Sequence, residues 1–162
     1  MIYEVEGDIL LSNAQAMAHG IAPNDDFKQG LAFSLKEGHP ELVKEFRSQS
    51  HKTRISEGGM WTWVSAEGKK VYNLMTQEHA RGAGATPGKA KLSYVNHSLK
   101  ELRKAIEKES IASLALPKLA TGVGGLDWEE VRPLIDKHLG DLEIPVYIYS
   151  TFHKGQKADE PQ

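Results

Sequence analysis

The stretch LPKLATGVGGLDW, from Leu116 to Trp128, decides the fold. A short apolar run typical of a buried strand passes into a glycine-rich loop, and a helix pattern follows. Gly122, Gly124 and Gly125 permit positive φ angles and let backbone N–H groups approach a ligand closely, which suits a phosphate. The spacing matches neither a Walker loop nor the G-x-G-x-x-G dinucleotide motif. Two interpretations stay open, an anion site and a tight strand-to-helix connection.

Short apolar runs alternate with helical patterns on the N-terminal side of this stretch, as in layered α/β domains. A second loop, Ala22 to Gly30, also joins a strand to a helix, and two such loops on one open sheet commonly meet at the same edge. They predict a cleft that straddles a diphosphate. Asp127 and Glu130 have the spacing of a capping box at the start of the last helix. The pattern predicts strands at residues 2–5, 16–21, 60–64, 70–75, 111–116 and 144–149, and helices at 29–36, after Pro40, at 92–109 and from Asp127.

The composition describes one globular domain without thiol chemistry. The chain has 162 residues, 20 Lys+Arg against 22 Asp+Glu, no cysteine and a formal net charge of −2. The absence of cysteine excludes disulfides, thiolate nucleophiles and iron–sulfur sites, and the charge argues against a protein that mainly neutralises nucleic-acid phosphates. The pattern contains no signal peptide and no membrane span, so we expect an intracellular, cytoplasmic monomer that does not act at a membrane. The histidines lack metal-ligand spacing, and neither a metal nor a cofactor is expected.

Four segments together resemble the macro domain family. They are Gly7-Asp8-Ile9, Ala18-His19-Gly20-Ile21, Gln29-Gly30-Leu31-Ala32 and, most specifically, residues 116–128. The likeness is greatest to the branch that contains terminal ADP-ribose protein glycohydrolase, the ALC-type macro domain and the yeast ADP-ribose 1''-phosphate phosphatase. It implies a three-layer α/β/α macro domain with a central mixed, largely parallel sheet over residues 1–152. Residues 153–162 then form a polar C-terminal tail, which we expect to be frayed.

The resemblance implies ligand contacts at matching positions. Asp8 accepts a hydrogen bond from the adenine amino group, the backbone N–H of Ile9 meets a ring nitrogen, and the two loops wrap the diphosphate and the distal ribose. Tyr149 or Phe152 stacks on adenine. Without the resemblance, Asp8 reads as a helix or turn cap and the two aromatic residues as packed side chains. The expected ligand-binding residues are Gly7, Asp8, Ile9, His19, Gly20, Ile21, Lys28, Gln29, Gly30, Leu31, Thr121, Gly122, Val123, Gly124, Gly125, Tyr149 and Phe152.

The expected chemistry is hydrolysis without a metal, with His19, Asp26 and Asp127 as candidate catalytic residues. An ordinary histidine pKa of about 6.5 would let His19 act as a general acid or base at neutral pH. Asp25 and Asp26 lie where a water could be activated near the distal ribose or its phosphate. The structural alternatives are a histidine bonded to backbone, a solvated carboxylate and, for Asp127, a helix cap. By resemblance, the glycohydrolase branch uses a lysine and an aspartate where this sequence has Thr76-Gln77-Glu78 and Gly124.

Two classes of function therefore stay open. As an enzyme, the protein would act on ADP-ribose 1''-phosphate or remove an ADP-ribosyl group from a protein or a nucleic acid. As a reader, it would bind and release ADP-ribose unchanged. The missing lysine and aspartate favour the reader, whereas His19 favours the enzyme. Residues 81–85 read as a lid over the cleft or, more simply, as a flexible surface loop.

Overall fold

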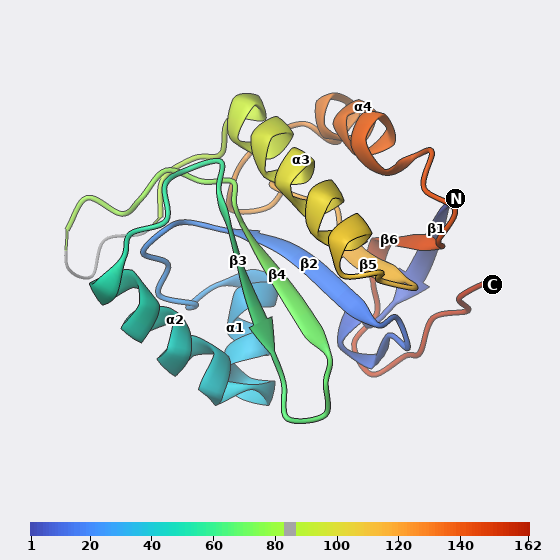
Figure 1. The fold of residues 1–162 in the computed structure, drawn as a ribbon, viewed down its shortest axis with the longest axis horizontal. Helices are drawn as coiled ribbons and strands as arrows, with labels where there is room; N and C mark the ends of the chain where they lie inside the picture. The colour runs from blue at the N-terminus through green and yellow to red at the C-terminus, as the bar shows by residue number, and fades with distance from the viewer. Residues whose placement is uncertain (83–86) are drawn as a thin grey trace.

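A computed structural model describes residues 1–82 and 87–162, so most of the predicted 81–85 lid lies outside the described residues. Six strands of the described chain form one sheet in the order β1-β6-β5-β2-β4-β3 (Figure 1). The β3–β4 pair is antiparallel and every other neighbouring pair is parallel, which confirms the mixed, largely parallel sheet. The strands are β1 (Ile2–Gly7), β2 (Ala16–Ile21), β3 (Met60–Val64), β4 (Lys70–Met75), β5 (Leu114–Pro117) and β6 (Val146–Phe152).

Helices cover both faces of this sheet, as expected for three layers (Figure 1). On one face lie α1 (Gly30–Gly38) and α2 (Pro40–Lys52), and on the other lie α3 (Leu92–Lys108) and α4 (Trp128–Leu139). Each helix buries the apolar side of a helical repeat: Val95, Leu99 and Leu102 of α3 are fully buried against the sheet. The central strand β2 is buried on both faces, which accounts for its nearly continuous apolar sequence.

The structure corrects two local predictions. The strand predicted at 111–116 is confined to Leu114–Pro117, because Ile111 closes the C-terminal turn of α3 through a bond from its N–H to the Ile106 carbonyl. The capping box is not formed: the Asp127 side chain makes no capping bond, and its carbonyl instead accepts the N–H groups of Glu130 and Val131. Asp127 is thus the N-cap of α4 by its backbone alone.

The C-terminal tail, residues 153–162, is largely exposed, but hydrogen bonds hold it in place rather than leaving it frayed. After β6 it turns back past η1, a short 3-10 helix at Ile9–Leu11 that follows β1 (Figure 1). The Glu160 carboxylate accepts bonds from the Ser12 hydroxyl at 2.6 Å and the Asn13 N–H at 3.0 Å. Ala158 packs beside the apolar cluster under α1 and α2. The polar composition of the tail supplies specific hydrogen bonds, which is why the expectation of fraying is wrong.

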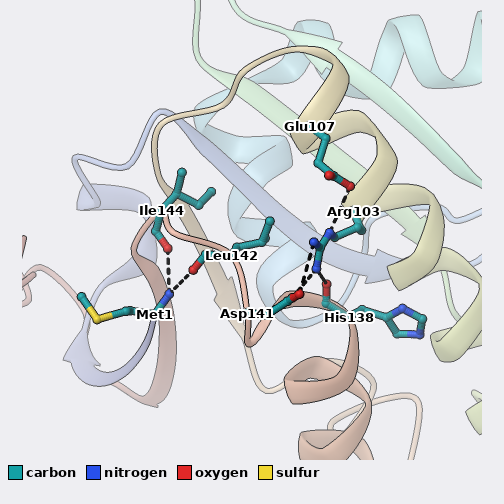
Figure 2. Close-up of polar contacts among 7 residues, drawn as sticks. All are labelled: Met1, Arg103, Glu107, His138, Asp141, Leu142 and Ile144. Carbon is teal, nitrogen blue, oxygen red and sulfur yellow. Dashed lines mark hydrogen bonds and ion pairs between the residues drawn. The ribbon is translucent and has the colours of Figure 1, made fainter.

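A polar network joins α3 to the end of α4 (Figure 2). The Arg103 guanidinium donates to the His138 carbonyl at 2.9 Å and to Glu107 at 3.0 Å, and it also pairs with Asp141. The amino group of Met1 donates to the carbonyl oxygens of Leu142 and Ile144, at 2.6 and 3.0 Å, beside the same connection. This network fixes the chain between α4 and β6.

Candidate functional site

A cleft of about 180 Å³ opens where β2 and β5 end, between the loop that precedes α1 and the loop that precedes α4. Both glycine-containing loops predicted to meet at one sheet edge contribute to it. Its lining residues are His19, Gly20, Asp25, Asp26, Gln29, Gly30, Leu31, Ala32, Gln77, Pro87, Pro117, Lys118, Leu119, Ala120, Gly122, Val123 and Gly124.

The first loop is shaped by the buried carboxylate of Asp25. Its oxygens accept the N–H groups of Ala22 at 3.0 Å and Phe27 at 2.9 Å, so the charge points into the loop backbone. Burial raises the pKa of Asp25, against the smaller lowering effect of these two backbone bonds. Phe27 has a φ of 57°, a left-handed conformation that is rare for an aromatic residue, and its fully buried ring packs on Phe46 at 5.5 Å. The loop before α1 is therefore held in one shape.

His19 lies in β2 at the floor of the cleft and is 2% exposed. Its Nε2 atom is 2.6 Å from Oδ1 of Asn73, its register partner on β4. Burial lowers the pKa of His19 from 6.5 to about 4, although the Asn73 bond opposes this shift. The imidazole is neutral at pH 7, so it can accept a proton or a hydrogen bond there. The expectation that His19 also stands ready as a general acid is not supported, because burial disfavours the imidazolium.

The second loop is closed by its own backbone. The Leu126 N–H donates to the Ala120 carbonyl at 3.0 Å and the Gly125 N–H to the Gly122 carbonyl at 3.1 Å. Gly124 lies so close to its surroundings that an added Cβ would fall 2.7 Å from the Ala120 carbonyl oxygen. Gly125 adopts a φ of 78°, which favours glycine. The sequence pattern thus serves a tight turn and also lines the cleft, so the two interpretations of these glycines are compatible.

Two cationic side chains can offset the charge of a bound anion at this edge. Lys118 lines the cleft, and its ammonium group lies 5.7 Å from the centre of the Trp128 ring. Lys28 is 64% exposed and lies 3.9 Å from the Asp26 carboxylate, whose charge it partly screens. Asp26 lines the cleft as expected, whereas Lys28 itself is outside the lining.

The structure brings about half of the predicted ligand-binding residues into this cleft. Asp127 also lies outside the lining, at the start of α4, and its exposed position gives no support for a catalytic role. The predicted residues in the lining are His19, Gly20, Asp26, Gln29, Gly30, Leu31, Gly122, Val123 and Gly124. The predicted residues outside it are Gly7, Asp8, Ile9, Ile21, Lys28, Thr121, Gly125, Tyr149, Phe152 and Asp127.

The residues expected to hold adenine meet the C-terminal tail. Asp8 caps η1 by accepting the Leu10 N–H at 3.0 Å, and its second carboxylate oxygen accepts the Gly155 N–H at 2.9 Å. Tyr149 is 6% exposed, and its hydroxyl donates to the Glu160 carboxylate at 2.6 Å. Phe152 is 56% exposed, so it is the accessible member of the predicted stacking pair.

Eight lining residues were not among the predicted site residues, and three of these eight are polar or charged: Asp25, Gln77 and Lys118. Lys118 stands inside the glycine-rich motif, so its position next to the loop was a usable signal. Gln77 belongs to the segment 76–78, where the glycohydrolase branch has its lysine by resemblance. Gln77 is buried, and its Nε2 donates to the Gly88 carbonyl at 3.0 Å. Asp25 shares its loop with Asp26, and no pattern separates the inward carboxylate from the outward one. Within residues 1–82 and 87–162, no group of three or more histidines and carboxylates is placed to hold a metal ion.

The fold and the cleft define the class of protein. A family model for the macro domain matches residues 34–135, and the chain therefore belongs to the macro domain family, as its motifs predicted. Helices of the described chain are all too short or too polar to cross a membrane.

Two relatives with named activities are similar to this chain over most of its length. A DNA ADP-ribosyl glycohydrolase of Mycobacterium tuberculosis is 27% identical over 153 residues, which cover 91% of this chain and 42% of the relative. The chain thus spans less than half the length of that protein. An ADP-ribose glycohydrolase of Homo sapiens is 22% identical over 147 residues, covering 90% of this chain and 89% of the relative.

Solved structures agree with these relatives. The macrodomain of Mycobacterium tuberculosis DarG superposes with a TM-score of 0.82 at 27% identity, covering 92% of this chain and 97% of that one. The macrodomain of Thermus aquaticus DarG superposes with a TM-score of 0.81 at 25% identity, and the match covers 93% of this chain and 98% of that one.

Proposed function

We propose that this macro domain binds ADP-ribose in the cleft between its two loops and hydrolyses the bond between ADP-ribose and a macromolecule. The observation that carries the proposal is the neutral His19 at the floor of a cleft built from both loops. The relatives named as ADP-ribosyl glycohydrolases support this substrate class, with ADP-ribosylated DNA or protein as the substrates to try first.

The cleft suits a diphosphate because its second loop offers backbone amide groups and Lys118 supplies a cation. The buried Asp25 carboxylate is satisfied by its own loop, so it does not oppose the ligand as an exposed charge would. The neutral imidazole of His19 can accept a hydrogen bond from a ribose hydroxyl or from the attacking water. Loop amides stabilise negative charge that develops on the ligand.

A reader function is the second candidate, and Gln77 and Gly124 favour it. By resemblance, these positions hold the lysine and the aspartate of the glycohydrolase branch, and an amide and a glycine cannot replace their chemistry. A lysyl adduct is therefore excluded as a route at Gln77. Removal of the 1''-phosphate from ADP-ribose 1''-phosphate is a further activity to test, in which His19 would handle protons and the loop amides would stabilise charge on the phosphate.

The first experiment is calorimetric titration with ADP-ribose. We expect saturable binding, and no heat at millimolar ADP-ribose together with better binding of adenosine nucleotides would contradict the proposal. Turnover of ADP-ribosylated DNA, ADP-ribosylated protein and ADP-ribose 1''-phosphate then separates the enzyme from the reader. His19→Ala should abolish turnover, while His51→Ala, which changes an exposed histidine on α2, should leave it unchanged. Binding without turnover of any of the three substrates would establish the reader.

A further inference from the structure

His19 lines the cleft, and its side chain contacts Asn73, a residue outside the lining. The two side chains face each other across β2 and β4, where the residues are register partners, and their polar atoms are 2.6 Å apart. Asn73 is fully buried, and His19 is 2% exposed. A buried amide on a central strand costs free energy unless each of its polar groups is bonded. Its partners therefore determine how it is oriented.

Asn73 can take only one orientation at low cost. Its Nδ2 group donates to the carbonyl oxygens of Trp61 at 3.1 Å and Val71 at 3.2 Å. A flipped amide would place Oδ1 against these two acceptors, leaving it without a donor. Oδ1 must therefore face Nε2 of His19, and at 2.6 Å that contact requires a proton on Nε2.

We propose that Asn73 is a positioning residue that fixes His19 as the Nε2–H tautomer and leaves Nδ1 as an unprotonated acceptor for the ligand in the cleft. The hydrogen bonds of the described residues include none to Nδ1. The ring lies 6.4 Å from that of Phe27, and the charged groups that line the same cleft are Asp25, Asp26 and Lys118. The acceptor role toward ADP-ribose rests on the proposed function, whereas the tautomer does not.

Nuclear magnetic resonance of protein labelled with ¹⁵N at histidine tests the tautomer directly. In the unliganded wild type at pH 7, we expect a protonated Nε2 whose proton exchanges slowly and resonates far downfield, with Nδ1 unprotonated. A protonated Nδ1 on His19 at this pH, in either the neutral ring or the imidazolium, would overturn the proposal. This measurement needs no variant, so it stands even if substitutions at Asn73 destabilise the fold.

A substitution then tests the cause. Asn73→Leu removes the acceptor at similar volume, and we expect the downfield Nε2 proton of His19 to disappear by exchange while both tautomers become populated. The chain offers a matched control in a second pair, where Nε2 of His138 lies 2.7 Å from Oδ1 of Asn96. Asn96→Leu should change the His138 signals and leave those of His19 in place. An unchanged His19 spectrum in a folded Asn73→Leu protein would remove Asn73 from this role.

Titration with ADP-ribose and measurements of turnover test the role of this tautomer in function. Addition of ADP-ribose to the wild type should shift the Nδ1 resonance of His19 as it accepts a hydrogen bond, while Nε2 stays protonated. In Asn73→Leu we expect kcat to fall about ten- to a hundredfold with little change in KM, the range seen when the partner that orients a functional histidine is lost. If the chemical shift of His19 Nδ1 does not change when ADP-ribose binds, the acceptor role is contradicted. Failure of the wild type to bind or turn over any substrate would count against the proposed function, and the tautomer would still be decided by the unliganded spectrum.

Discussion

At the scale of single residues, Gly124 explains why this chain departs from the glycohydrolase branch it resembles. The second loop folds so tightly that a Cβ at Gly124 would lie 2.7 Å from the Ala120 carbonyl oxygen and 2.8 Å from the Ala90 Cβ. Both neighbours are rigid, since one is backbone and the other is a methyl group. An aspartate cannot stand here while the loop keeps its present path, so the difference from the branch involves the shape of the loop as well as one side chain.

Gly124→Asp should therefore destabilise the protein. We expect the free energy of unfolding to fall by about 1–3 kcal/mol, the usual cost of forcing a side chain into a packed site. Thermal and urea unfolding measure this change. Gly122→Asp is the matched control, because a Cβ at Gly122 meets nothing within 4 Å and the same charge is added to the same loop. Equal melting temperatures for the two variants would contradict the steric argument.

At the scale of elements, the C-terminal tail makes tertiary contacts that its polar sequence does not indicate. Residues 153–162 contain no apolar repeat, yet Glu160 bonds to Ser12 and Asn13 near the N-terminus and to Tyr149 of β6. Ala158 of the tail packs against the apolar cluster on the α1–α2 face of the sheet, a cluster that includes Val5 of β1 and Tyr149 of β6. The tail thereby takes the place of a third covering element on that face.

Glu160→Ala should loosen the tail and leave the Tyr149 hydroxyl without its partner. We expect a loss of about 1–3 kcal/mol in the free energy of unfolding, the cost of an unsatisfied half-buried polar group. The neighbouring Asp159 is exposed, so Asp159→Ala removes the same charge from the tail and should change stability little. Hydrogen exchange at Asn13, whose N–H bonds to Glu160, should accelerate in the first variant alone. Slow exchange at Asn13 in Glu160→Ala would show that the tail does not depend on this carboxylate.

The elements also show how far the sequence could predict the structure. Helical spacing of Val95, Leu99 and Leu102 predicted α3 correctly because a single buried face determines that pattern. The two loops and His19 were predicted at one edge because parallel strands place their carboxyl ends together. The inward turn of Asp25 was not predictable, since it depends on backbone N–H groups that only the folded loop directs at the carboxylate. The tail contacts were missed for a related reason: they join residues far apart in the chain.

At the scale of the whole molecule, one of the two helical layers carries a polar link between its helices. On the α3–α4 side, Arg103 ties one helix to the end of the other through the His138 carbonyl and Asp141 (Figure 2). The Asp141 side chain is 74% exposed, so its ion pair is weakened by solvent, whereas the carbonyl bond is partly shielded. The link between these two helices therefore depends more on a hydrogen bond than on charge.

Arg103→Ala should lower the free energy of unfolding by about 1–2 kcal/mol, mainly through the lost bond to the His138 carbonyl. Because the ion pairs contribute little, the loss should persist at about 0.5 M salt, where exposed charges are screened. Lys104→Ala is the control, since it removes a neighbouring cation whose side chain is 63% exposed and lies 3.7 Å from the Glu101 carboxylate. A loss that vanishes at high salt would assign the link to charge instead. Urea unfolding at low and high salt measures the difference.

The pH dependence of global stability reports on the buried histidine. The pKa of His19 falls from 6.5 to about 4 on folding, so between these values the unfolded chain binds more protons than the native protein. The stability that the neutral His19 maintains is present above about pH 6.5 and is lost as the pH falls toward 4. Asp25 acts in the opposite direction, because burial raises its pKa and favours the native state at low pH.

A comparison of wild type with His19→Gln isolates the histidine, since Asp25 is present in both proteins. Between pH 7 and pH 5, the free energy of unfolding of the wild type should fall by about 2 kcal/mol more than that of His19→Gln, as a shift of this size implies. Urea unfolding at the two pH values measures the difference. His51→Gln, which changes an exposed histidine, should keep the wild-type slope. Parallel slopes for wild type and His19→Gln would mean that folding does not lower the pKa of His19 and that the native cleft holds an imidazolium at pH 5.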